Sequence, residues 1–303
     1  MNSQLTKILL ALDPSDSEFR PTRRSLSWFK KWAGDRKARV EAIYVSFGHS
    51  NVKPVTTEHE FGDFVKSLDL GPDVVSSILI EKSSSRRAAA LRLAGFAKGE
   101  KADLIAVSSH GRSGPARLVL GSFAESLLAV SQVPLLFLTE HEDQRPHANK
   151  VLFPTDFSPA SKVALDLFLK EMAGTTCEVV IFHAESPPGA IFSTGIIGIP
   201  YYLPESYWLE QKQWTGNEAE KLVKSVQERG FKVKSLIQDG VLNTAASIQK
   251  AAQEENVDFI AMSSVSRGFD SAVIGSVAKE IFRLKRWPVW VCGPEVSLKN
   301  GLM

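Results

Sequence analysis

The sequence predicts an α/β fold made of two open, doubly wound parallel five-stranded sheets related by internal duplication. Short apolar runs alternate with amphipathic stretches, which is typical of parallel strands covered by helices on both faces. The same order of motifs occurs twice along the chain. At 303 residues the chain has room for about two domains, each with its own core.

The first part of the chain reads as alternating strands and helices. Its strand candidates are Ile8–Leu12, Val40–Val45, Val75–Ile80, Leu104–Ser108 and Leu135–Leu138. Its helix candidates lie near Arg23–Trp32, Arg86–Lys98 and Ser122–Val130. This order implies right-handed crossovers, with ligands expected at the carboxyl ends of the strands.

Four collinear matches indicate the duplication. They pair Lys7-Ile-Leu-Leu-Ala-Leu-Asp13 with Lys150-Val-Leu-Phe-Pro-Thr-Asp156, Asp103-Leu-Ile-Ala-Val-Ser-Ser with Asp258-Phe-Ile-Ala-Met-Ser-Ser, Gly121-Ser-Phe-Ala with Gly275-Ser-Val-Ala, and Val133-Pro with Trp287-Pro. The polar stretch 140–149 has linker composition. We therefore predict a first half of residues 1–144 and a second half of residues 145–303.

Composition excludes several classes of protein. The net charge of +2 argues against a nucleic-acid or membrane surface. The longest early apolar run, Ile8–Leu12, is far shorter than the about 20 residues of a membrane span. Cys177 and Cys292 lack metal-ligand spacing, so we expect buried reduced thiols. We expect a cytoplasmic protein.

A small-residue loop in the first half is the main candidate for chemistry. After the fourth strand candidate the chain reads Ser108-Ser-His-Gly-Arg-Ser-Gly, and Gly121-Ser122 opens a helix. Glycines let backbone N–H groups approach an anion closely, and a helix N-terminus adds its positive dipole end. The pattern indicates a phosphate-binding loop, although turn chemistry alone explains the glycines equally well.

These motifs resemble the universal stress protein family, specifically its tandem two-domain members, over nearly the whole chain. The resemblance implies an adenine-nucleotide alpha hydrolase-like fold and binding of ATP, alone or with Mg²⁺. Family members that bind ATP carry Gly, two residues, Gly, nine residues, Gly, then Ser or Thr. Here Gly111 and Gly121-Ser122 fit that spacing, but Ser108 stands at the first glycine.

The resemblance also implies roles for individual residues. Asp13 and Val45 would contact the adenosine part, while Gly111, Gly121 and Ser122 would hold the phosphates. The remaining candidates lie in or beside the loop: Ser108, Ser109, His110, Arg112 and Phe123. Arg112 and Arg117 could neutralise phosphate charge.

Structural roles compete with these assignments. Asp13 could cap a turn with Ser15. Ser122 and Glu125 fit the capping box Ser-x-x-Glu. His110 fits a loop-ordering hydrogen-bond partner better than a base.

The second half departs further from the binding pattern. It retains Pro154-Thr-Asp156-Phe-Ser and His183-Ala184, but its loop has Ser263 and Ser266 at the glycine positions, and eight residues precede Gly275-Ser276. We expect a scaffold half whose pocket is closed or adapted to another ligand. Its weaker candidate residues are Pro154, Asp156, Ala184, Ser263, Gly275 and Ser276.

An apolar insertion distinguishes the second half. Residues 186–204 hold no charged residue and several Gly and Pro residues, which argues against a regular helix. They could pack on the first half or a second subunit, wall an apolar pocket beside Asp156 and His183, or form a loop without a specific partner. Residues 208–227 read as a long amphipathic helix.

The closing strands predict how the halves meet. Val133-Pro134 and Trp287-Pro288 place proline at the start of each last strand, which suits a sheet edge. Family members with one domain dimerise through these edges. A tandem chain can pair its own two edges, giving a pseudo-twofold monomer that buries Trp287 and Trp290, with a homodimer as a further arrangement.

We expect a ligand-dependent regulator of the stress response without dedicated catalysis. The sequence has no Walker Gly-Lys-Ser, no nucleophile elbow and no paired metal-ligand motif. Slow ATP hydrolysis stays compatible with it. The alternative is a non-nucleotide interaction or apolar-ligand-binding module of the same fold. A phosphotransfer or adenylate-forming enzyme has the weakest support, because catalytic residues are missing.

Overall fold

The structure is a computed structural model that describes residues 6–14, 23–48, 57–108, 122–139, 149–185, 205–265, 274–284 and 286–301. Within these ranges, none of the helices combines the length and the hydropathy needed to cross a bilayer.

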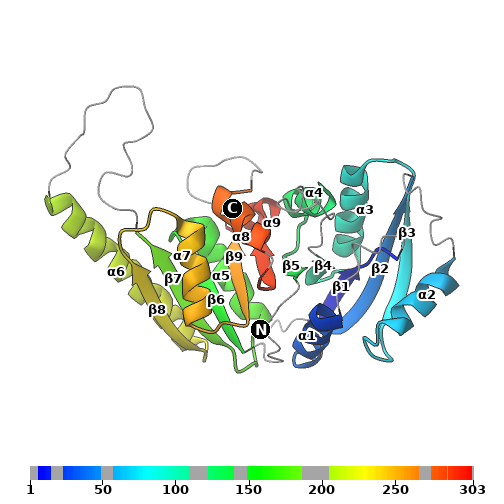
Figure 1. Cartoon of the computed structure of the whole chain (residues 1–303), viewed down its shortest axis with the longest axis horizontal. Coiled ribbons are helices and arrows are strands. Elements are labelled where there is room, and N and C mark those ends of the chain that lie inside the picture. Colours follow the sequence, from blue (N-terminus) through cyan, green and yellow to red (C-terminus); the bar gives the residue numbers. More distant parts are fainter. Residues whose placement is uncertain are drawn as a thin grey trace.

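Ten strands form one continuous sheet in the order β3-β2-β1-β4-β5-β10-β9-β6-β7-β8 (Figure 1). The first half contributes β1 (Lys7–Ala11), β2 (Arg39–Phe47), β3 (Val75–Glu81), β4 (Leu104–Ser108) and β5 (Leu135–Leu138). The second contributes β6 (Lys150–Pro154), β7 (Glu178–Ala184), β8 (Lys232–Gln238), β9 (Phe259–Ser263) and β10 (Val289–Cys292). Within each half all strand pairs are parallel, as expected.

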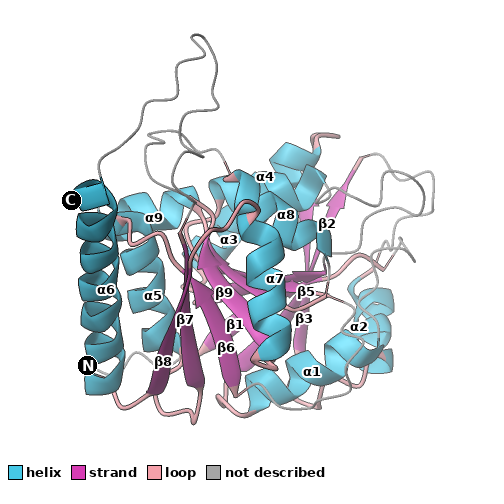
Figure 2. Cartoon of the chain, turned by 60° about the vertical axis from the view of Figure 1, so that its left-hand side comes forward, coloured by secondary structure: helices cyan, strands magenta, loops and turns pink. Residues whose placement is uncertain are grey.

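Helices cover both faces of this sheet (Figure 2). One core lies under α1 (Arg23–Gly34), α2 (Glu58–Ser67), α5 (Pro159–Glu171), α6 (Glu205–Glu228) and α9 (Pro294–Gly301). The other lies under α3 (Arg86–Gly99), α4 (Ser122–Val130), α7 (Thr244–Glu254) and α8 (Ser276–Leu284). Alternate strand residues supply the two cores because successive side chains point to opposite faces. The predicted α/β class and the duplication are confirmed.

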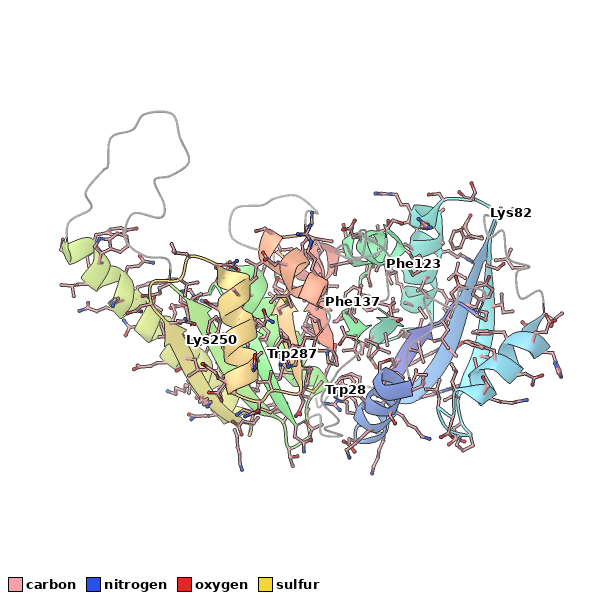
Figure 3. All side chains as sticks on the ribbon, in the orientation of Figure 1. Trp28, Lys82, Phe123, Phe137, Lys250 and Trp287 are labelled. Carbon is pink, nitrogen blue, oxygen red and sulfur yellow. The ribbon has the colours of Figure 1, made fainter. Side chains whose placement is uncertain are left out.

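The halves join through their last strands. β5 and β10 pair antiparallel, with Trp290 opposite Leu136, so the two predicted sheets merge into one. Trp287 and Trp290 are both buried, as expected at this junction. Phe137 of β5, labelled in Figure 3, lies with its ring centroid 4.8 Å from that of Phe282 in α8. The predicted pairing of the chain's own edges is confirmed.

A duplicated ion network marks the amino ends of the strands. In the first half the Lys7 ammonium lies 3.0 Å from Glu41 and 2.7 Å from Glu100. In the second half Lys150 lies 3.4 Å from Glu178 and 3.0 Å from Glu255. Asp103 and Asp258 complete the network by accepting backbone N–H groups at the starts of β1 and β6. The two halves therefore share polar contacts as well as strand order.

The elements differ from the predictions mainly at their ends. β2 continues to Phe47, and the long helix extends from Glu205 to Glu228. In the first half α2 had no prediction, and in the second half only the long helix was predicted by its residues, so α5, α7 and α8 were implied by the duplication alone and α9 had no prediction. The α2 sequence, Glu-His-Glu-Phe-Gly-Asp-Phe-Val-Lys-Ser, has few apolar residues, of which Phe61 and Val65 are buried.

Candidate functional site

The carboxyl ends of the strands form the edge where each half is expected to bind ligands, at the top of Figure 1. In each half the chain direction across the sheet reverses at one strand pair, β1 with β4 and β6 with β9. Such switch points are the usual ligand positions in open α/β sheets. Lys82, directly after β3, marks this edge in Figure 3.

The first site, defined by Asp13, Val45, Ser108, Ser122 and Phe123, lies at the first switch point. Asp13 follows β1 by two residues and is half-buried, and Ser108 ends the neighbouring β4. Val45 lies inside β2, opposite Leu79 of β3, with its side chain in the core. Only the backbone of Val45 is therefore suited to contact a ligand.

The helix α4 begins at Ser122, as predicted. The Ser122 hydroxyl accepts a hydrogen bond of 3.1 Å from the guanidinium of Arg86, the first residue of α3. Phe123 is half-buried against the core at the start of α4 (Figure 3). The N-termini of α3 and α4 thus meet at this edge, with a cation between them.

The remaining first-half candidates, Ser109, His110, Gly111, Arg112 and Gly121, lie outside the described residues. The same holds for Ser15, Arg117 and the insertion 186–204. Their assignments stay predictions.

The second half contains a cavity of about 270 Å³ at its switch point, here called the second cavity. Five of the six weaker candidates line it: Pro154, Asp156, Ala184, Ser263 and Gly275. Ser276 is exposed at the start of α8 and is not among the lining residues. The expectation for this half was a pocket either closed or adapted to another ligand; the cavity among the described residues argues against the first alternative, and the second stays a prediction.

A strained turn presents Asp156 to the second cavity. Phe157 has a positive φ of 58°, a conformation that costs a non-glycine residue roughly 1–2 kcal/mol. Two hydrogen bonds hold it: Phe157 N–H donates to Thr155 Oγ1 at 3.0 Å, and Ser158 N–H donates to Asp156 Oδ1 at 3.0 Å. Strain of this kind gathers at functional sites.

An aromatic cluster packs against the same turn. The ring of Phe157 lies 4.5 Å from the His183 ring and 5.8 Å from the Trp214 ring of α6, centroid to centroid. His183 Nδ1 lies 2.7 Å from the carbonyl oxygen of Thr155. Because a carbonyl only accepts, Nδ1 carries the proton. His183 is therefore fixed in orientation within the wall of the cavity.

At the two described ends of the loop after β9, three backbone donors are already hydrogen-bonded. Ser264 N–H donates to Cys292 O at 2.9 Å, and Gly275 N–H donates to Ser264 O at 2.8 Å. Val265 N–H donates to the Ser263 hydroxyl at 3.2 Å. The Ser264 hydroxyl is buried and has no hydrogen-bond partner among the described residues. Such a group is costly unless a ligand or water satisfies it.

Sequence reasoning missed three residues at these edges: Arg86, Thr244 and Ser264. Arg86 carried a signal, because a cation in the first turn of a helix opposes the helix dipole and suggests an anion nearby. Thr244 begins α7, as Arg86 begins α3, and it lines the second cavity. The missing partner of Ser264 depends on packing and had no signal in the sequence.

Two doubly wound units joined in one sheet, with a cavity at the switch point of the second, define a tandem α/β protein. The chain belongs to the universal stress protein family, whose sequence profile matches residues 76–138 and 147–293.

Similar proteins agree with this assignment. Universal stress protein MJ0577 of Methanocaldococcus jannaschii is 30% identical over 162 residues, which cover 50% of this chain and 96% of that protein. A universal stress protein from Archaeoglobus fulgidus has the same fold, with a TM-score of 0.62, 18% identity, and coverage of 97% of this chain and 98% of the other. A protein of unknown function from Pseudomonas aeruginosa aligns with a TM-score of 0.65 at 16% identity, covering 98% and 95%. These two structures bear on the fold alone.

Proposed function

We propose that this protein is a stress-response regulator that binds an adenine nucleotide at the first site, without dedicated catalysis. The observation that carries the proposal is the hydrogen bond from Arg86 to Ser122, which joins the N-termini of α3 and α4 at the edge of the sheet where β1 leads to Asp13 and β4 ends at Ser108. Helix N-termini and an arginine together favour a phosphate group.

Each described residue then has a defined part in binding. The Asp13 carboxylate accepts hydrogen bonds from ribose hydroxyls, and the β2 backbone near Val45 contacts the base. Arg86 and the Ser122 hydroxyl contact phosphate oxygens. ATP, with or without Mg²⁺, is the nucleotide that the family resemblance favours. Groups of three or more His, Cys, Asp or Glu side chains suited to a metal are absent from the described residues.

Isothermal titration calorimetry with ATP and Mg²⁺ tests the proposal on matched variants. Arg86→Gln removes the bridging charge, and we expect roughly tenfold weaker binding. Arg87→Gln removes the same charge from the next residue of the turn and should bind as the wild type does. Gly121→Asp should abolish binding by placing a carboxylate in the loop.

The proposal fails if the wild type gives no heat with ATP, or if Arg86→Gln and Arg87→Gln bind ATP equally well. Native mass spectrometry of the purified protein adds an independent measurement. A co-purified adenine nucleotide supports the proposal, whereas an apolar molecule supports the alternative of an apolar-ligand-binding module.

A further inference from the structure

We infer that the outer face of α3 is a docking site for an acidic segment of a partner protein, one that carries apolar side chains between its carboxylates. This α3 face is formed by Arg87, Leu91, Arg92, Gly95 and Lys98, all of them exposed. The helix packs against β2, β3 and α4 in the outer part of the first half (Figure 1). The inference concerns a protein partner and does not depend on nucleotide binding at the first site.

The five residues share one side of the helix. Arg87, Leu91 and Gly95 follow one another at four-residue spacing, which places them in one row along an α-helix. Arg92 precedes Gly95 by three residues and Lys98 follows it by three, so both are its neighbours on the helix surface. The buried residues of α3 occupy the opposite side, against the core.

The charge of the α3 face is not balanced within the protein. Each of α1, α2, α5, α6 and α7 pairs a lysine with a carboxylate three or four residues away. In contrast, α3 contains no acidic residue, and Arg87, Arg92 and Lys98 form no ion pair with any described residue. Glu100, which follows the helix, is held by the Lys7 ammonium at 2.7 Å. Three cations are therefore available to carboxylates from outside.

Leu91 and Gly95 add a feature that folding does not require. The Leu91 side chain is 50% exposed. A Cβ at Gly95 would have nothing within 4 Å, so packing inside the chain does not call for glycine there. Glycine within a helix is destabilising relative to alanine, but it lets another backbone approach closely. An exposed leucine beside a bare stretch of helix backbone suits an apolar side chain of a partner.

The corresponding helix of the second half lacks these features. Both α3 and α7 follow the third strand of their half and cover the same core. The α7 sequence has one cation, Lys250, which lies 3.8 Å from Glu254, and it has no glycine. The scaffold therefore does not need a cationic helix at this position, and the α3 face belongs to a role of the first half alone.

The carboxylates of a peptide fit this face better than other anions do. A guanidinium group matches the planar carboxylate with two parallel hydrogen bonds. The 14 residues of α3 make a helix about 20 Å long, which is the length of a short peptide segment. The net charge of +2 is low for a nucleic-acid surface, and one leucine offers too little apolar area to anchor the chain on a membrane.

Fluorescence anisotropy on the full chain tests the inference with a labelled helical peptide of Glu and Leu, its leucines at helical spacing. Arg92→Gln and Leu91→Ala should each weaken binding of this peptide roughly three- to tenfold. The matched control Arg283→Gln removes an exposed arginine from α8 in the second half and should bind the peptide as the wild type does. Added salt should weaken the binding, because the cations are exposed.

Gly95→Ala separates docking from folding. The new methyl group meets nothing in the chain, so thermal stability should rise, while affinity for the Glu and Leu peptide should fall roughly threefold or more. A purely structural role for Gly95 would move stability alone. Peptide affinity equal to that of the wild type would contradict the inference.

Two control peptides and two other anionic surfaces complete the test. One peptide replaces every Glu by Gln and the other replaces every Leu by Gln, and both should bind more weakly than the Glu and Leu peptide. The inference is overturned if either control binds as tightly, or if Arg92→Gln binds the Glu and Leu peptide as the wild type does. It is also overturned if duplex DNA or phosphatidylserine vesicles bind more tightly than the peptide and lose that binding in Arg92→Gln.

Discussion

The two halves place a carboxylate at the same edge of the sheet but follow it with different backbones. Asp13 is followed by Pro14, whose ring fixes φ at about −65°. Asp156 is followed by Phe157 with a φ of 58°. The two turns therefore cannot share one conformation, although the strands before them match.

The helix starts at this edge differ in charge and in capping. At the start of α7, the Asn243 side chain accepts from Ala246 N–H at 2.9 Å. At the start of α3, Ser85 makes no such bond, and Arg86 follows it. By contrast, the lysine networks at the amino ends are nearly the same in both halves. The duplication has kept the scaffold and changed the groups at the carboxyl edge of the sheet.

The largest expected effect concerns how far the first site depends on the second half. A Cβ at Gly293, between β10 and α9, would lie 2.6 Å from the backbone oxygen of Leu128 in α4, the helix that begins at Ser122. Gly293→Ala should therefore lower the free energy of unfolding by about 1–3 kcal/mol and weaken ATP binding.

Denaturant unfolding and ATP titration measure both effects. Gly95→Ala in α3 is the control, because nothing lies within 4 Å of its Cβ position, and it should be stabilising by roughly 0.5–1 kcal/mol. Unchanged stability and ATP binding in Gly293→Ala would show that the halves are independent.

A pH-dependent contribution is expected next, from a carboxyl group in the second half beside the junction. Burial raises the pKa of Glu171 from 4.5 to about 8, and Asp103 adds to this rise. Two neighbours oppose it: Trp290, whose Nε1–H donates to Glu171 Oε2 at 2.8 Å, and Arg36. The folded state thus binds a proton that the unfolded state releases between these pH values. The contribution of Glu171 to stability should fall by up to about 1.4 kcal/mol per pH unit from pH 4.5 to 8.

Glu171→Gln keeps an acceptor for Trp290 but removes the proton equilibrium. The difference in unfolding free energy between this variant and the wild type should grow in favour of the variant across that pH range. Glu228→Gln, an exposed residue at the end of α6, should show no such trend. Parallel pH profiles for wild type and Glu171→Gln would refute the assignment.

A third change sharpens the comparison of charge at the two sites. Thr244→Arg gives the second cavity the cation that Arg86 provides in the first half. We expect AMP affinity at the second cavity to rise roughly tenfold, measured by calorimetry in the Asp13→Ala background, which lacks the first-site carboxylate. The control Thr244→Gln adds length without charge and should leave AMP binding unchanged. An equal gain in AMP affinity in both variants would count against an electrostatic cause.

The sequence predicted the sheet better than the sites, for physical reasons. The periodicity of apolar residues reports burial, and the prolines in Val133-Pro134 and Trp287-Pro288 report sheet edges. Both signals are local in the sequence, so the strands and their junction were predictable. The φ of Phe157 and the unpartnered hydroxyl of Ser264 arise from packing between distant segments. The glycines lost from the loop suggested a second pocket either closed or adapted to another ligand, whereas the described residues that line the cavity come mainly from elements other than that loop.

The smallest expected effect tests whether helix capping differs between the halves as the structure indicates. Asn243→Ala removes a side-chain cap from α7, and we expect a loss of about 1 kcal/mol in the free energy of unfolding. Ser85→Ala removes a hydroxyl that does not cap α3, so its effect should stay within about 0.5 kcal/mol. Denaturant melts of the two variants decide the point. Equal losses would mean that Ser85 does cap α3, and the N-terminus of α3 would then be less available to a phosphate than the first site requires.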